Sequence, residues 1–109
     1  MAKLTVIRWR DIPAQIVVKK GRETVRLPLS ARFQEAVDRA AMRAGKTSSH
    51  AYIADWERSA PRDCGDDLRS EAEAEIERLE ARYTDDDLLR LIRAKGLEEG
   101  SAESLPPDA

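Results

Sequence analysis

The hydrophobic pattern of the chain changes once, at Pro28–Ser30. Before this point the apolar residues are mostly β-branched and come in short runs, whereas after it they recur every three or four residues. Short β-branched runs are typical of strands, and a spacing near 3.6 residues is typical of helices. The sequence therefore predicts an α+β fold: an N-terminal antiparallel β-hairpin or small sheet packed against three to four helices, with a helical C-terminal half.

Three strands are predicted before the change, at residues 4–10, 14–19 and 23–27. Ile12-Pro13 is expected to separate the first two, because proline lacks the N–H that a strand ladder uses. Lys20-Gly21 is expected to form the tight turn of a hairpin, since glycine accepts positive φ without steric cost.

Two long helices and one shorter helix are predicted after the change. Ser30 is a suitable N-cap for residues 31–44, and Gly45 stands where a left-handed C-terminal residue belongs. Residues 67–83 have an apolar seam, which is made by Leu68, Ala72, Ile76, Leu79 and Tyr83. Thr84 is expected to cap a last helix that ends at Gly96, with Asp85–Asp87 at its positive dipole end.

Between the helices the pattern is ambiguous. Residues 50–59 suit a short helix, and residues 51–56 suit a strand equally well. Residues 60–65 are expected to be a loop. We expect residues 1–97 to form a single α+β domain and residues 98–109, which are poor in apolar side chains, to be a disordered tail.

Charge is divided unevenly along the 109 residues, although the net charge is only −2. Residues 1–50 hold 11 Lys/Arg and 4 Asp/Glu, whereas residues 51–109 hold 8 Lys/Arg and 17 Asp/Glu. Such a division suggests an acidic partner for the first half, a basic partner for the second, or self-association into a homo-oligomer. The alternative is that the two halves fold against each other and much of the difference cancels.

The compartment is expected to be the cytoplasm. A single cysteine, Cys64, excludes an internal disulfide framework and suits a reducing environment. The first residues lack the charged and apolar segments of a secretory signal, and no stretch approaches the roughly 18 apolar residues that a membrane helix requires.

Catalytic and metal-binding machinery is not recognisable, so we expect a protein that is not an enzyme and has no cofactor or metal. His50 is the only histidine and has no companion for a metal site or a general base. Cys64 has no paired base. There is no GxGxxG, GxxxxGK[ST] or CxxC motif.

The acidic runs are better explained by structure than by metal binding. Asp85–Asp87 lacks the alternating ligands, the glycine and the distal glutamate of a calcium loop, and it suits a helix N-terminus. Glu71, Glu73, Glu75 and Glu77 would spread around a helix and form a solvated face.

Basic residues crowd the predicted hairpin. Arg8 and Arg10 flank Trp9, and Lys19, Lys20, Arg22 and Arg26 follow. Such a ribbon could contact phosphates in the major groove of DNA. Lysines and arginines on an edge hairpin also prevent edge-to-edge aggregation, which would need no partner.

The string from Arg8 to Gln15, RWRDIPAQ, is the most distinctive part of the sequence. Together with Lys20-Gly21-Arg22, Phe33-x-x-Ala36-Val37-Asp38-Arg39 and Ala51–Trp56, it resembles the bacterial virulence factor domain family over about residues 3–95. The resemblance implies no biochemical activity and no catalytic residues. It suggests a small accessory protein.

A partial resemblance to ribbon-helix-helix DNA-binding modules is also present. It rests on Thr24–Pro28, the helix to Ala44, Gly45 and Thr47-Ser48-Ser49. By this resemblance Thr24 and Arg26 would contact bases, and the amides of Thr47, Ser48 and Ser49 would hold a phosphate. The chain departs from the module by two further strands before the ribbon, which would pair with it, and by an acidic extension after it.

Two functions follow as hypotheses. The first is a non-catalytic accessory or protein-interaction protein whose contact residues are Arg8, Trp9, Arg10, Asp11, Pro13, Gln15, Lys20 and Arg22. The alternative is a ribbon-helix-helix-like DNA-binding transcriptional regulator, for which nucleic acid is a possible but not a favoured partner. No membrane partner is expected.

Overall fold

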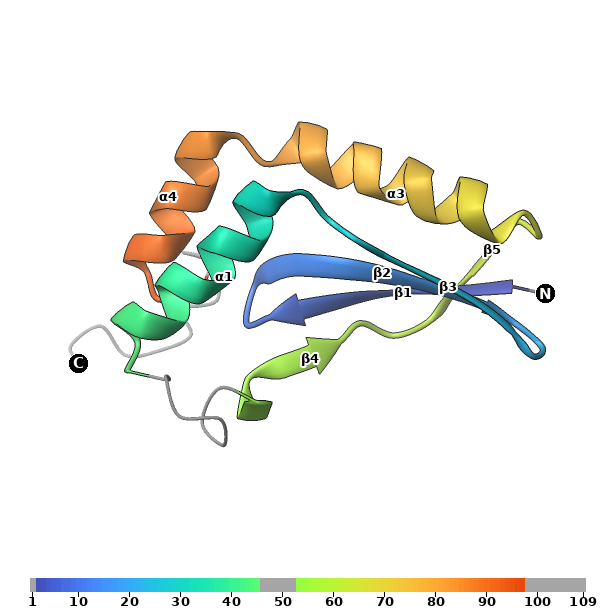
Figure 1. Ribbon diagram of the computed structural model, residues 1–109, viewed down its shortest axis with the longest axis horizontal. Coiled ribbons are helices and arrows are strands. Elements are labelled where there is room, and N and C mark those ends of the chain that lie inside the picture. The colour runs from blue at the N-terminus through green and yellow to red at the C-terminus, as the bar shows by residue number, and fades with distance from the viewer. Residues whose placement is uncertain (1, 46–52, 98–109) are drawn as a thin grey trace.

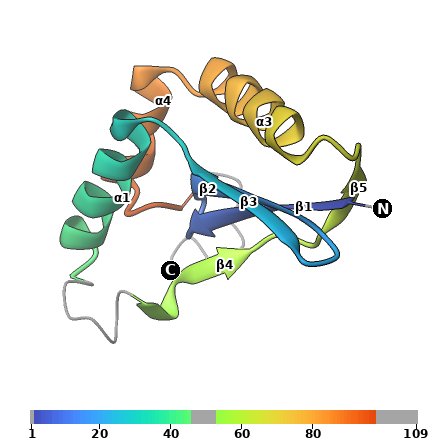
Figure 2. The ribbon, with the colours of Figure 1, turned by 45° about the vertical axis from the view of Figure 1, so that its right-hand side comes forward.

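The computed structural model describes residues 2–45 and 53–97, and in these ranges an antiparallel sheet is covered by helices on one face (Figures 1 and 2). The elements in chain order are β1 (Ala2–Trp9), β2 (Ile12–Lys20), β3 (Glu23–Pro28), α1 (Ala31–Arg43), β4 (Trp56–Arg58), β5 (Arg62–Cys64), α3 (Leu68–Arg82) and α4 (Asp85–Arg93). The predicted α+β class, with its N-terminal antiparallel sheet and helical C-terminal half, is confirmed.

β1 is the central strand of the sheet. The strand order is β3-β2-β1-β4, and β5 pairs with β1 beside β4, all in antiparallel register. β4 pairs with Ile7–Trp9 and β5 with Ala2–Leu4, so these two short strands share one edge of β1. Having neighbours on both edges suits the sequence of β1, which is apolar along most of its length.

The core lies between one face of the sheet and the three helices. The sheet contributes alternate residues, among them Leu4, Val6, Ile16 and Val18, and Val25 and Leu27 of β3 pack against them. α3 crosses above β1, β2 and β3, and α1 packs on β2 and beside α4 (Figure 2). The buried side chains of the helices are Phe33, Ala36, Val37, Ala40, Ala41, Leu68, Ala72, Leu79, Leu88, Leu91 and Ile92. The predicted apolar seam of α3 is therefore the face that meets the sheet.

Pro13 does not end a strand, as the sequence suggested, but lies inside β2. The register shifts here, since Ile7 pairs with Gln15 and Arg8 pairs with Pro13, which leaves Ala14 as an extra residue in β2. This β-bulge explains why proline is tolerated. The Ala14 carbonyl accepts hydrogen bonds from the Leu29 N–H at 2.9 Å and the Gln34 side-chain amide at 2.9 Å, so it connects β2 to the start of α1.

The helix termini follow the sequence closely. Asp67 caps α3 by accepting a hydrogen bond from the Ser70 N–H, and Thr84 and Asp87 form a reciprocal capping box at α4. Gly45 has φ +74°, as expected of a left-handed residue after a helix. Ser30 occupies the N-cap position of α1, but its hydroxyl and its N–H both donate to the Glu80 carboxylate of α3 instead.

Two predictions between the helices are wrong. The segment from Arg62 to Cys64, which was expected to lie in a loop, is strand β5. Residues 53–54 are helical and the strand β4 begins only at Trp56, so neither a helix to residue 59 nor a strand over 51–56 is observed. Both short strands exist because β1 offers them an edge, which is a tertiary effect that a local pattern does not contain. Residues 46–52 and the predicted tail 98–109 lie outside the described residues.

Glu75 is a further correction, because it does not lie on a solvated face. Its side chain is only 5% exposed and forms ion pairs with Arg62 of β5 and Arg78 of α3. The Arg62 Nη2 to Glu75 Oε1 distance is 2.6 Å. This buried carboxylate thus ties β5 to α3.

None of the helices in the described ranges is long and apolar enough to cross a membrane.

Candidate functional site

The RWRDIPAQ string mainly builds the turn between β1 and β2. Trp9 and Ile12 are fully buried and pair across the turn, and Trp56 pairs with Trp9 from the other side. Pro13 is buried at the bulge. The predicted contact residues Trp9 and Pro13 therefore present no side chain to a partner in the described fold, and any role of theirs in binding is through the turn that they support.

Arg10 holds this turn to two distant segments. It has a left-handed backbone with φ +55°, and its N–H donates to the Asp55 carbonyl at 3.0 Å. Its guanidinium donates to the Lys95 carbonyl at 2.8 Å, forms an ion pair with the Asp55 carboxylate at 3.4 Å and lies 5.1 Å from the centre of the Trp9 ring. Arg10 is thus used within the fold, as a clamp on the turn.

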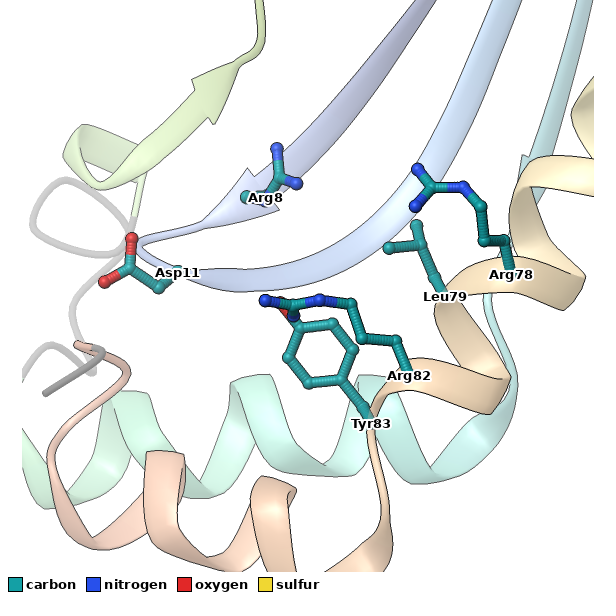
Figure 3. A pocket seen from close by; sticks show the side chains of 6 residues that line it. All are labelled: Arg8, Asp11, Arg78, Leu79, Arg82 and Tyr83. Atoms are coloured by element: carbon teal, nitrogen blue, oxygen red, sulfur yellow. The ribbon is translucent and has the colours of Figure 1, made fainter. Parts of the chain in front are cut away.

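A hollow lies next to this turn, between the end of β1 and the C-terminal half of α3 (Figure 3). Its volume is about 280 Å³. It is lined by Arg8, Asp11, Arg78, Leu79, Arg82 and Tyr83, and we call it the arginine hollow. The structure thus brings two predicted contact residues, Arg8 and Asp11, together with two arginines and a leucine of α3 and the adjoining Tyr83.

The other basic surface is the face of the sheet that no described helix covers. Alternation along the strands turns Lys3, Thr5, Ile7, Gln15, Val17, Lys19, Thr24, Arg26 and Arg58 to this side, and the register aligns them in rows across the strands. We call these residues the open face, although two of them, Ile7 and Val17, are themselves buried. Lys3 stands directly opposite Lys19, Val17 opposite Arg26, and Ile7 opposite Arg58.

The open face has few carboxylates of its own. Asp63 of β5 forms an ion pair with Lys3, and Arg26 donates to the Gln15 side-chain oxygen at 3.0 Å. Lys19 and Arg58 are exposed and form no ion pair with other described residues. At the hairpin tip, Lys20 pairs with Asp66 at 3.3 Å and Arg22 is exposed. Two like charges directly opposite each other, as in Lys3 and Lys19, destabilise a sheet by themselves.

With this geometry described, comparison with protein families gives a clear result. The family model with the description virulence factor matches residues 7–92, which is most of the chain. The chain belongs to the virulence factor family. Comparison with curated proteins and with solved structures gives no match. This match confirms the family resemblance that the RWRDIPAQ string suggested. It does not show a biochemical role.

The residues of the alternative DNA-binding hypothesis are only partly described. Thr24 and Arg26 are exposed on the open face, at the outer strand β3. Thr47, Ser48 and Ser49 lie outside the described residues. β3 pairs with β2 along its whole length. The segment that resembled the DNA-binding ribbon is therefore the edge strand of a wider sheet. The two strands that precede it in the sequence had suggested this pairing.

Side chains with chemical reactivity are sparse in the described ranges. No group of three or more His, Cys, Asp or Glu side chains is arranged there to hold a metal ion. Burial raises the pKa of the Cys64 thiol, and the neighbouring Glu71 raises it further, so the thiolate is disfavoured. His50 lies outside the described residues. Asp87 acts within the capping box, where the Thr84 N–H and Arg90 lower the pKa of its carboxyl.

Lys3, Arg58, Arg78 and Arg82 are the basic residues of the open face and the arginine hollow that the sequence did not single out. Arg78 and Arg82 stand four residues apart in the last turns of α3, where cations are expected simply to complement the helix dipole. Arg58 lies in a segment whose secondary structure was ambiguous. Their grouping with Arg8 or with Arg26 depends on strand pairing and on the path of α3, and no local signal predicts either.

Proposed function

We propose that this member of the virulence factor family is a non-catalytic accessory protein that binds an acidic segment of a protein partner on the open face. The observation in its favour is the open face itself. Cationic side chains from four strands lie in register there, and the helices, which carry most of the described acidic residues of the second half, lie on the other side (Figure 2). Complementary charge steers association and fixes which partner is accepted.

The unfavourable pairing of charges supports this proposal. Lys3 and Lys19 stand opposite each other, and although Asp63 pairs with Lys3, Lys19, Arg26 and Arg58 receive no carboxylate from the described residues. Such an arrangement costs stability in the free chain. An anionic partner would remove that cost on binding, so the open face suits recognition better than it suits folding.

DNA is the second candidate, and the exposed pair Thr24 and Arg26 is the observation that favours it. The width of the sheet speaks against it. Strands lie about 4.8 Å apart, so four strands span roughly 14 Å between the outer axes, whereas the major groove is about 12 Å wide and admits two strands. We therefore place the acidic protein partner first.

The test is affinity purification from the native host, with crosslinking to map the contacts. The bait is the full chain, its open-face variant Lys19→Gln/Arg26→Gln/Arg58→Gln, or the control variant Arg39→Gln/Arg69→Gln/Arg93→Gln. Each variant removes three exposed cations, and the control residues lie on helices. The expected result is that crosslinks join the open face to acidic segments, and that only the open-face variant loses the partner.

Equal recovery by both variants would contradict the proposal. A duplex DNA titration at about 50 mM salt distinguishes the second candidate, because phosphate contacts make affinity fall steeply as salt rises. Saturable duplex binding that the open-face variant loses would place DNA first instead. A Trp9→Ala variant is unsuitable as a probe of this surface, since Trp9 is buried and its loss tests folding.

A further inference from the structure

The arginine hollow lies on the helix side of the sheet and has no part in the proposed function. Its walls come from two directions: Arg8 and Asp11 from the β1–β2 turn region, and Arg78, Leu79, Arg82 and Tyr83 from α3 and the residue after it (Figure 3). Leu79 and Tyr83 are buried, so they form a firm floor, while Arg78 and Arg82 are exposed at the rim. The hollow is therefore a fixed shape edged with cations.

The three guanidinium groups are held in different ways. Arg82 stacks on the Tyr83 ring at 4.8 Å, and Arg78 is oriented by its ion pair with the buried Glu75. Arg8 is fixed at its backbone by the ladders to β2 and β4. Arg78 and Arg82 stand four residues apart, so they lie on the same side of α3, where like charges destabilise a helix. Figure 3 shows both extending from α3 toward the strand that holds Arg8.

Nearby carboxylates leave these cations only partly compensated. Glu75 is shared between Arg78 and Arg62, and Glu57 stands across from Arg8 on β4. The side chains of Arg8 and Arg82 form no ion pair or hydrogen bond with other described residues. Arg82 in particular has an aromatic support and no anion, which is how arginine is presented in many sites that recognise phosphate or carboxylate.

We propose that the arginine hollow binds a small molecule that bears a phosphate monoester group, with the phosphate held by Arg8 and Arg82. Arg78, already shared with Glu75, contributes a third guanidinium at the edge. A phosphate accepts hydrogen bonds on three oxygens, so it can use donors from two walls at once, whereas one carboxylate is satisfied by one arginine fork.

The size of the hollow and the position of Asp11 limit the rest of the ligand. Sites for drug-sized ligands are about 300–1,000 Å³, so a hollow of about 280 Å³ suits a phosphate with a few further atoms. Asp11 lies at the opposite end of the hollow from Arg78 (Figure 3). Its negative charge would disfavour a second anionic group on the ligand. The ligand class is therefore a small phosphate monoester with no other anionic group.

The test is calorimetric titration of the full chain at constant ionic strength in chloride, with glycerol 3-phosphate, inorganic phosphate, acetate and glycerol as separate probes. Glycerol 3-phosphate is expected to bind most tightly and inorganic phosphate more weakly, with no saturable binding of acetate or glycerol. The phosphate and acetate arms separate the phosphate group from a mere anion. The glycerol arm tests whether the hydroxyls bind alone.

Variants connect the binding to the hollow. Arg8→Gln and Arg82→Gln should each weaken glycerol 3-phosphate binding at least about tenfold, because each removes a charged hydrogen-bond donor to the phosphate. The control Arg39→Gln, an exposed arginine of α1, should change it less than about twofold.

Several results would overturn this inference. The first is no saturable binding of glycerol 3-phosphate up to about 10 mM, which is roughly ten times a Kd of 1 mM. The second is an equal loss of binding in Arg39→Gln and Arg82→Gln. The third is acetate binding as tight as that of the phosphate monoester. Urea unfolding of each variant shows whether it is folded. Because Lys19, Arg26 and Arg58 are unchanged in these variants, failure here leaves the open-face proposal standing, and the reverse also holds.

Discussion

Replacing Arg10 separates two opposing contributions at one residue. The left-handed backbone, with φ +55°, is unfavourable for any residue with a Cβ, by about 1–2 kcal/mol. The side chain is favourable, because it donates to the Lys95 carbonyl, pairs with Asp55 and lies over Trp9. Arg10→Ala removes the side-chain contacts and keeps the backbone cost, whereas Arg10→Gly removes both.

The magnitudes follow from the contacts. A hydrogen bond to a charged group contributes about 1.5–3 kcal/mol, and a cation over a ring adds about 0.5–1 kcal/mol at a partly exposed site. The side chains of Arg10 and Asp55 are 16% and 24% exposed, so the ion pair is only partly screened by water. We expect Arg10→Ala to lower the free energy of unfolding by roughly 2–3 kcal/mol.

Arg10→Gly is expected to be about 1 kcal/mol more stable than Arg10→Ala, although it lacks the same contacts. Glycine loses more conformational entropy on folding, by roughly 0.5–1 kcal/mol, and this offsets part of the relief. Arg10→Lys should lie between wild type and Arg10→Ala, since an ammonium group does not reproduce the planar fork of a guanidinium. Urea unfolding followed by circular dichroism measures all three.

The matched control is Arg39→Ala, an exposed arginine of α1, which should change stability by less than about 0.5 kcal/mol. The reasoning is refuted if Arg10→Gly is no more stable than Arg10→Ala, because the turn would then not be strained. It is refuted equally if Arg10→Ala resembles the Arg39→Ala control.

Three further stability predictions concern the helices, and urea unfolding checks each. Thr84→Ala should cost about 1 kcal/mol, because it removes the side-chain half of the α4 capping box. Burial raises the pKa of Glu80, but hydrogen bonds from Ser30 and Arg32 outweigh this and hold it below 4.5. A lowered folded-state pKa gives stability that is present above the unfolded pKa and is lost as pH falls through the folded pKa. The stability gap between wild type and Glu80→Gln should therefore shrink as pH falls below about 4.5; a constant gap would contradict this. Glu75→Met should have a free energy of unfolding within about 1 kcal/mol of wild type. Replacing the carboxylate removes its desolvation cost, and both arginine partners, which are 53% and 62% exposed, keep contact with water. A loss above about 3 kcal/mol would show that the ion pairs stabilise the fold.

The sequence predicts the parts of this fold that depend on local chemistry. The turn at Gly21, the cap Thr84 and the apolar seam of α3 all follow from hydrogen-bond or periodicity rules that act over a few residues. β5 and the late start of β4 could not be predicted, because these strands form only where β1 offers an unpaired edge. Pro13 misled for a similar reason, since the bulge that accommodates it depends on the register with Arg8.

The candidate site shows the same limit more strongly. The predicted contact residues are neighbours in the sequence, but the fold divides them among the buried turn, the arginine hollow and the open face. Alternation alone assigns Gln15 and Arg26 to one face, so part of the open face was predictable from sequence. The arginine hollow was not predictable, because its two walls are about 70 residues apart in the chain. Nothing in the sequence of α3 alone indicates that its residues face Arg8.

The most distinctive string of the family is therefore explained in two steps. Trp9, Ile12 and Pro13 are buried, so their chemistry is accounted for by packing and by the bulge. Arg8 precedes Trp9 and Asp11 lies between Trp9 and Ile12, and the same turn fixes both at the hollow. If Arg8 and Asp11 served only to solvate the turn, exchanging them for glutamine and asparagine would leave phosphate binding intact, and it is that measurement which decides between the two explanations.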